Sequence, residues 1–166
     1  MAILPDVLKP GLALVFCGTA VSRASQQRGY PYGNPGNRFW PTLKRLAIVP
    51  ADFDPRQFPR LTEHGIGYTD LNKVQVGIDS ELDPAHFDAA SLRRKLRRHR
   101  PRLLAFTSKN AGAAFFGTRA IGFGLQPAMV LDIEVHVLPS PSGLATSHWD
   151  IGPWRALAHR LQGLRG

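Results

Sequence analysis

The stretch between Cys17 and Phe39 constrains the chain most, because its character changes at both ends. A short apolar run, Leu12–Cys17, stops at Gly18, and a long stretch rich in Gly, Pro, Asn, Ser and Tyr follows before apolar residues resume. α/β proteins usually place ligand sites where a buried strand opens into a polar loop ahead of a helix. The segment Val137–Trp149 repeats this arrangement near the other end. We therefore expect an α/β protein that binds its ligand with two long loops.

Apolar patterning along the chain predicts strands that alternate with helices. Such alternation is typical of a parallel sheet covered on both faces, with the ligand loops beyond the carboxyl ends of the strands. We predict a three-layer α/β/α fold with a mainly parallel sheet of four to five strands, in one domain over residues 1–166. The expected strands are Leu12–Cys17, Ile66–Leu71, Arg102–Thr107 and, within Met129–Leu138, one centred on Glu134–Leu138. The expected helices are Phe39–Ile48, Pro84–His99, Lys109–Phe116 and Pro153–Leu164.

The charge of the chain points to an anionic partner. The 166 residues carry a formal net charge of +9, and much of it lies in the basic run 93–102, which has leucines at helical spacing. A basic balance of this size favours nucleic acid, although a basic helix face is also common as a solvated surface. The single cysteine, Cys17, excludes an internal disulfide and is expected in the core. No signal peptide or membrane span is expected, so the bacterial cytosol or nucleoid is the expected compartment.

Four pieces of the sequence, taken in order, resemble one known family. They are FCG with the downstream YPYGNPGNRFW, GIGYTDL at 65–71, RPRLLAFTSKNA, and LPSPSGL at 138–144. Together they are similar to the uracil-DNA glycosylase superfamily, and most of all to its mismatch-specific uracil/thymine branch. The resemblance implies a monofunctional DNA glycosylase that flips uracil out of DNA and hydrolyses its N-glycosidic bond. Hypoxanthine and xanthine are further expected substrates. The resemblance also implies base excision repair, a monomer acting on DNA, and no cofactor or metal.

One departure from the family pattern affects catalysis. The branch has an Asn after its first strand that positions the attacking water, and Ala20 occupies that position here. A hypoxanthine-excising branch also lacks this residue and is thought to rely on an Asn in the segment that matches Pro35–Trp40. Asn37 is therefore a candidate, as is Asp70, the only acid within the matching motifs. Ser140 stands where other branches have the His or Asn that stabilises the leaving base.

The remaining candidates bind the base or the DNA backbone. Tyr32 is expected to stack on the base, Asn72 or Asp70 to recognise its Watson–Crick edge, and Leu144 to act as the wedge that opens the base stack. Each of three candidates also has a purely structural alternative. Asp70 could cap a turn or a helix, Asn37 could hydrogen-bond to the loop backbone, and Tyr32 could be a packing aromatic. The full set of base-binding candidates is Tyr32, Asn72, Gly18 and Ser22, and the DNA-binding candidates are Leu144, Ser142, Gly143, Arg23, Lys109 and His148.

Two other functions remain open from the sequence. Ala20 favours a catalytically weak relative that binds damaged or abasic DNA without cutting it. A basic α/β chain could also be an unrelated enzyme that acts on a nucleotide or another phosphorylated small molecule. Salt-dependent binding to DNA would distinguish a DNA-binding protein from the latter.

Overall fold

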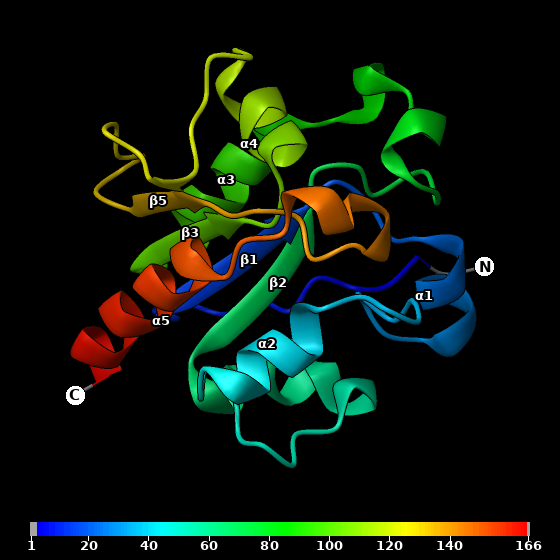
Figure 1. The fold of residues 1–166 in the computed structure, drawn as a ribbon. Coiled ribbons are helices and arrows are strands. Elements are labelled where there is room, and N and C mark those ends of the chain that lie inside the picture. The colour runs from blue at the N-terminus through cyan, green and yellow to red at the C-terminus, as the bar shows by residue number, and fades with distance from the viewer. Residues whose placement is uncertain (1–2, 166) are drawn as a thin grey trace.

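A five-stranded sheet forms the centre of the protein, whose computed structural model describes residues 3–165. The strand order is β2-β1-β3-β5-β4. Neighbouring strands run parallel except for β4, which pairs antiparallel with β5 at one edge. The predicted, mainly parallel sheet is confirmed (Figure 1). The strands are β1 (Leu14–Gly18), β2 (Ile66–Asp70), β3 (Leu103–Phe106), β4 (Gly124–Leu125) and β5 (Glu134–Val137).

Helices cover both faces of this sheet and give three layers (Figure 1). One face packs against α3 (Ala89–His99) and α4 (Lys109–Phe116). The other packs against α2 (Phe39–Arg45) and α5 (Gly152–Arg165). A further short helix, α1 (Arg23–Arg28), lies in the loop after β1. None of the described helices combines the length and the apolar character needed to cross a membrane.

Alternation along the central strand explains why the sheet needs two covering layers. Leu14 and Phe16 of β1 belong to the core under α2 and α5, whereas Val15 and Cys17 belong to the core under α3 and α4. Successive side chains of a strand point to opposite faces, so a strand that is apolar throughout must be buried on both. All four side chains are at most 1% exposed. The expected core position of Cys17 is confirmed.

Most predicted elements differ from the structure by one to three residues at an end, but one predicted helix is divided in two. The segment predicted as one helix, Pro84–His99, contains a 3-10 turn at Pro84–His86 and then α3. Asp83 caps the first turn through the backbone N–H of Ala85, and Asp88 caps α3 through that of Ser91. Each capping carboxylate starts a separate helical segment, because it satisfies N–H groups that a continuous helix would bond internally.

The chain between α4 and β5 also differs from the expectation. The segment expected as a loop, 117–127, contains the edge strand β4. The strand expected within Met129–Leu138 is β5, which agrees with its expected centre at Glu134–Leu138. A tight turn separates the two strands, in which Leu131 and Asp132 have φ values of 51° and 67°. Left-handed backbone cannot continue a strand, so β5 begins only after this turn.

The parallel register brings four loops to one edge of the sheet. Gly18 pairs with Asp70, Cys17 with Phe106, and Phe106 with Val137. The carboxyl ends of β1, β2, β3 and β5 therefore lie side by side, as predicted. The connection after β1 leads to β2 on one side of β1, and the next connection leads to β3 on its other side. The strand order therefore reverses direction at β1. Open α/β sheets bind ligands at such a switch point.

Candidate functional site

A cavity of about 600 Å³ opens at the carboxyl edge of the sheet. Its lining comes from the loop after β1, the end of β2, the turn between β3 and α4, and the loop after β5. Most of the predicted site residues lie in this lining. They are Gly18, Ser22, Tyr32, Asn37, Asp70, Lys109, Ser140, Ser142, Leu144 and His148.

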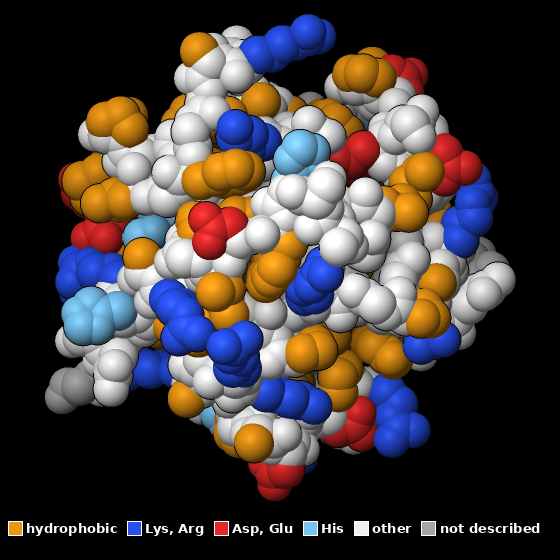
Figure 2. Space-filling model, viewed as in Figure 1, with side chains coloured by type: hydrophobic (Ala, Val, Ile, Leu, Met, Phe, Trp, Pro, Cys, Tyr) orange, Lys and Arg blue, Asp and Glu red, His pale blue; other side chains and the backbone are white. Residues whose placement is uncertain are grey.

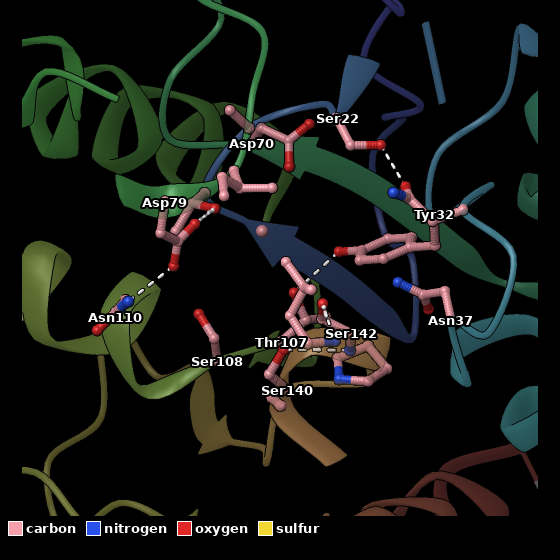
Figure 3. Close-up of a pocket in the computed structure, with 18 of the residues that line it drawn as sticks. Ser22, Tyr32, Asn37, Asp70, Asp79, Thr107, Ser108, Asn110, Ser140 and Ser142 are labelled. Carbon is pink, nitrogen blue, oxygen red and sulfur yellow. Dashed lines mark hydrogen bonds between the residues drawn. The ribbon is translucent and has the colours of Figure 1, made fainter. Parts of the chain in front are cut away.

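Three polar side chains converge on Gly18 at the inner end of the cavity (Figure 3). A Cβ atom built on Gly18 would lie 2.7 Å from Asp70 Oδ1, 2.9 Å from the Tyr32 hydroxyl and 3.3 Å from Thr107 Oγ1. The Tyr32 hydroxyl and Thr107 Oγ1 are themselves hydrogen-bonded at 2.9 Å. Any larger residue at position 18 would displace these groups. Glycine therefore keeps a carboxyl and two hydroxyls together on the cavity floor.

Asp70 is the buried acid of this floor. It ends β2, is 4% exposed, and accepts a hydrogen bond from the Tyr68 hydroxyl at Oδ2. Burial raises the pKa of the Asp70 carboxyl to about 7, although the charge of Lys73 and the bond from Tyr68 act in the opposite direction. Near neutral pH the carboxyl therefore exists in both charge states. Its Oδ1 atom, the one nearest Gly18, is the oxygen left to bind a ligand.

Tyr32 forms a wall of the cavity. Its ring stacks on Phe39 at 3.8 Å with an interplanar angle of 14°, so one ring face is covered by the protein. Its backbone has a φ of 55°, a left-handed conformation that costs energy for a residue with a side chain. Burial, followed by the negative charge of Asp70, raises the pKa of the Tyr32 hydroxyl well above its usual value. The hydroxyl therefore stays neutral and can act as a donor.

The side-chain amide of Asn37 uses its oxygen for a bond within the protein and has its nitrogen free for the cavity. Its Oδ1 accepts a 2.9 Å hydrogen bond from the backbone N–H of Phe39, at the start of α2. The amide nitrogen lies on the side of Tyr32 (Figure 3). Because the oxygen is engaged in the turn, Asn37 presents N–H donors to a ligand or water.

Ser22 belongs to a hydroxyl network on the same side of the cavity. It caps α1 by accepting from the backbone N–H of Ser25, and it donates to Asn34 Oδ1. Ser25 also donates to Asn34 Oδ1, at 3.4 Å. These bonds orient the Asn34 side chain, another cavity residue. From the sequence, Asn34 could direct water as well as Asn37, although an Asn-Pro pair is also common in turns.

The loop after β5 places an apolar side chain on the rim. Ser140 Oγ accepts from the backbone N–H of Ser142, and Ser142 Oγ accepts from that of Leu144. This stacked pair of turns leaves the Leu144 side chain 78% exposed. Both serine hydroxyl hydrogens remain available to donate, because each oxygen acts as the acceptor in these bonds.

The two long loops contact each other beside the cavity. The backbone N–H of Arg38 donates to the carbonyl of Pro141 at 2.8 Å. A Cβ atom built on Gly143 would lie 3.5 Å from the carbonyl oxygen of Gly36. That distance is ordinary van der Waals contact, so the space at Gly143 does not require a glycine, and Gly143 does not itself line the cavity.

Asn72 and Arg23, like Gly143, were predicted site residues and lie outside the cavity lining. Asn72 is completely buried, and its Oδ1 accepts from the backbone N–H groups of Val74 and Gln75. The chain turns after Asp70, so Asn72 stabilises that turn instead of following Asp70 into the cavity. Arg23 forms a 2.9 Å exposed ion pair with Glu81, which lowers its availability for phosphate.

A bridge across the opposite side of the cavity was not predicted. Asp79 accepts from Thr19 Oγ1 at 2.6 Å and from Asn110 Nδ2 at 2.7 Å (Figure 3). It thereby joins the loop after β1 to the start of α4. The segment that carries Asp79 has no recognisable motif, so only the tertiary structure shows that it lines the cavity.

Few basic side chains belong to the cavity itself. Figure 2 shows Lys and Arg spread over the viewed face among apolar side chains. Lys109 and His148 belong to the cavity lining, and Arg38 lies 5.3 Å from the Trp149 ring on the adjoining loop. Within residues 3–165, no group of three or more His, Cys, Asp and Glu side chains has a metal-binding arrangement.

The fold is thus a three-layer α/β/α fold, with a cavity at the switch point of its sheet. A model of the Uracil DNA glycosylase superfamily matches residues 5–159. The solution NMR structure of a "putative Uracil DNA glycosylase" from Methanosarcina acetivorans is similar in fold, with a TM-score of 0.68 and 24% sequence identity over 97% of this chain and 98% of that chain. The chain belongs to the uracil DNA glycosylase superfamily.

Proposed function

We propose that this protein is a monofunctional DNA glycosylase of the mismatch-specific uracil/thymine type, which initiates base excision repair. It flips uracil, and also hypoxanthine or xanthine, out of DNA and hydrolyses the N-glycosidic bond without a cofactor. It acts as a monomer on DNA containing such a deaminated base, in the cytosol or nucleoid. Family membership and a strongly basic chain support this proposal.

The observation that carries the proposal is the floor of the cavity. Asp70 Oδ1, the Tyr32 hydroxyl and Thr107 Oγ1 converge on Gly18 inside a cavity large enough for a nucleobase. Leu144 stands exposed on the rim, where an apolar side chain can enter a base stack. A polar floor with an apolar wedge suits an enzyme that extrudes a base and binds its polar edge.

Asp70 is best placed to bind the edge of the extruded base. It lies at the end of a strand next to Gly18, whereas the sugar of a flipped nucleotide would remain near the rim. Uracil, hypoxanthine and xanthine all present a carbonyl beside an N–H group. The protonated carboxyl can donate to that carbonyl through Oδ1. Because the base leaves as an anion, the neutral form of Asp70 favours bond cleavage and the ionised form repels the leaving group.

Water and leaving-group stabilisation are assigned to the two loops. Asn37 presents N–H donors that can hold a water against the sugar, and the bond to Phe39 fixes the orientation of its amide. Ser140 can donate its hydroxyl to the departing base. Lys109, His148 and Ser142 contact the DNA backbone in this proposal, and their position in the cavity lining supports that role.

One observation favours a second candidate function. Ala20 lines the cavity where the related branch has the water-positioning Asn, and an alanine methyl can neither donate nor accept. A protein that binds damaged or abasic DNA without cutting it would need the base pocket and wedge but no such residue. This alternative predicts tight binding with no release of base.

A cleavage assay on labelled oligonucleotides tests the proposal. The substrates carry uracil opposite G, opposite A or in single strand, with hypoxanthine in parallel, and alkali then cuts abasic sites. Cleavage at the uracil that is lost in Asn37→Ala establishes the glycosylase. Retained binding to uracil or abasic DNA without cleavage favours the alternative, and binding to neither refutes both.

A further inference from the structure

An exposed aromatic ring stands at the cavity rim and has no role in the proposed reaction. Phe123 is 42% exposed and belongs to the cavity lining. It comes from the glycine-rich segment between α4 and β5, whereas the proposed wedge, Leu144, comes from the loop after β5. Two separate loops therefore bring apolar side chains to the same opening.

The backbone around Phe123 is held in place by a side-chain clamp. Gln126 Nε2 donates to the carbonyls of Gly122 and Gly124, at 2.9 Å each, so both neighbours of Phe123 are bonded to one amide. Gly124 has a φ of 91°, which a residue with a side chain would adopt only with strain. The backbone N–H of Gln126 also donates to Val135 of β5 at 2.8 Å. The ring is thus presented from a turn tied to the sheet.

A cation lies directly over this ring. Lys109 Nζ is 4.4 Å from the centroid of the Phe123 ring, within the range of a cation–π interaction. Lys109 is the first residue of α4, immediately after the turn that follows β3. An aromatic face for stacking, combined with a positive charge for the backbone, is the means by which proteins hold unpaired nucleic acid strands.

We propose that Phe123 and Lys109 form a second nucleobase subsite, which stacks the base next to the flipped nucleotide while the ammonium contacts the adjoining phosphate. This proposal rests on the proposed action on DNA. Flipping one nucleotide removes a stacking partner from its neighbour, and the Phe123 ring can replace that partner. The subsite would hold this neighbour in single strands and in locally opened duplex.

Exposed apolar residues elsewhere on the same segment provide a control. Leu125 and Met129 are 61% and 55% exposed, and neither lines the cavity. Single exposed apolar side chains are common on protein surfaces and need no function. Phe123 differs from these two because it combines rim position, an amide clamp and a cation over its ring.

The test measures binding to single-stranded oligonucleotides by fluorescence anisotropy. Each carries a 2′-fluoro-arabino uridine, which resists cleavage, and the base on its 5′ or 3′ side is either present or replaced by an abasic spacer. The proteins are wild type, Phe123→Leu, Phe123→Trp and the control Leu125→Ala. We expect wild type and Leu125→Ala to lose about tenfold in affinity when the neighbouring base on one side is missing.

Phe123→Leu keeps apolar bulk but has no aromatic face, so it should bind both oligonucleotides equally, whereas Phe123→Trp should restore the discrimination. If wild type shows no discrimination on either side, or Phe123→Leu keeps it in full, the subsite is refuted while DNA binding stands. Failure of wild type to bind any of the oligonucleotides would refute the action on DNA as well. The spacer comparison in wild type needs no variant, so a folding defect cannot obscure the result.

Discussion

Two carboxyl groups beside β2, the partly exposed Asp6 and the buried Asp70, have opposite environments. Asp6 contacts Lys73 Nζ at 3.0 Å and Lys95 Nζ at 2.8 Å, and it accepts from Thr69 Oγ1 at 2.7 Å. Burial raises the pKa of Asp6, but these bonds and charges outweigh it and leave the pKa below the usual value. Asp70 has the Tyr68 hydroxyl as its donor, and burial brings its pKa to about 7.

The difference separates a structural carboxylate from a site carboxyl. Thr69 and Asp70 are successive residues of β2, so their side chains point to opposite faces of the strand. On one face, two ammonium groups compensate the charge of Asp6. On the other, Asp70 faces the cavity with an oxygen unpaired. A buried acid left without full compensation at a cavity is typical of functional sites, because it costs stability.

Removing the site carboxyl should have the largest effect. We expect Asp70→Ala to lower the single-turnover rate of uracil excision about 10²- to 10³-fold, because a polar contact to the leaving base is lost. Because burial raises the folded-state pKa of Asp70 from 3.8 to about 7, its carboxyl destabilises the fold increasingly between about pH 4 and 7 and fully above that range. The free energy of unfolding at pH 8 should therefore not fall in Asp70→Ala. Guanidinium denaturation beside the excision assay checks both. A variant with normal excision would show that Asp70 is not a site residue.

Removing the structural carboxylate should affect stability instead. Asp6→Asn leaves Lys73 and Lys95 without a counter-charge and should lower the free energy of unfolding by about 2 kcal/mol at pH 7. Because the folded-state pKa of Asp6 lies below its usual 3.8, this contribution is present above about pH 4 and is lost as the pH falls further. The exposed pair Asp54–Arg56 offers the control, and Asp54→Asn should change nothing measurable. An Asp6→Asn protein as stable as wild type would contradict this assignment.

Removing the hydrogen bond to Asp70 should have a smaller effect, which changes the pKa of Asp70 and leaves the ion pairs of Asp6 in place. Tyr68→Phe removes the hydroxyl that donates to Asp70 and lowers its pKa, so the pKa of Asp70 should rise further. Excision should then persist to higher pH, with a change of about fivefold in relative rate at pH 8 for one lost hydrogen bond. A pH profile of single-turnover excision measures this. A shift toward lower pH would contradict it.

Substitution of a buried histidine away from the cavity should have the smallest effect on excision. His136 of β5 is 4% exposed, both ring nitrogens are buried without a hydrogen-bond partner, and it does not line the cavity. Burial lowers its pKa below 6.5, so stability is lost as the pH falls below that value, where only the unfolded state gains the proton. His136→Leu should reduce this acid sensitivity in thermal melts and leave excision within about twofold. A large loss of excision in His136→Leu would contradict the contrast between Asp70 and groups away from the cavity, because a buried titratable group outside the cavity would then also affect the reaction.

The bounds of an element were predictable where a capping or terminating residue in the sequence marks each of its ends. Helix α4 has the predicted bounds, because Ser108 caps its start and Gly117 ends it with a φ of 70°. Helix α1 was missed because its six residues lie within the polar loop and depend on the cap from Ser22. Strand β4 was missed because its two residues acquire strand geometry only by pairing with β5.

The site was predictable to the extent that strand ends determine it. Gly18 and Asp70 follow directly from the ends of β1 and β2, which are paired in register. Asn72 was predicted in the site because the family resemblance puts a base-reading side chain at this position, but the direction of its side chain depends on a turn that the sequence does not reveal. Asp79 and Phe123 reach the cavity from segments without motifs, and only long-range packing places them there.

The most direct test of the contrast is the pH dependence of single-turnover uracil excision by wild type and Asp70→Asn, between pH 5.5 and 9. A side-chain amide stays neutral throughout this range, whereas the Asp70 carboxyl, with a pKa of about 7, ionises within it. The account predicts that the wild-type rate falls as the pH rises through about 7 and that the Asp70→Asn rate shows no such fall. Parallel profiles for the two proteins would contradict it, because the charge of Asp70 would then have no part in the reaction.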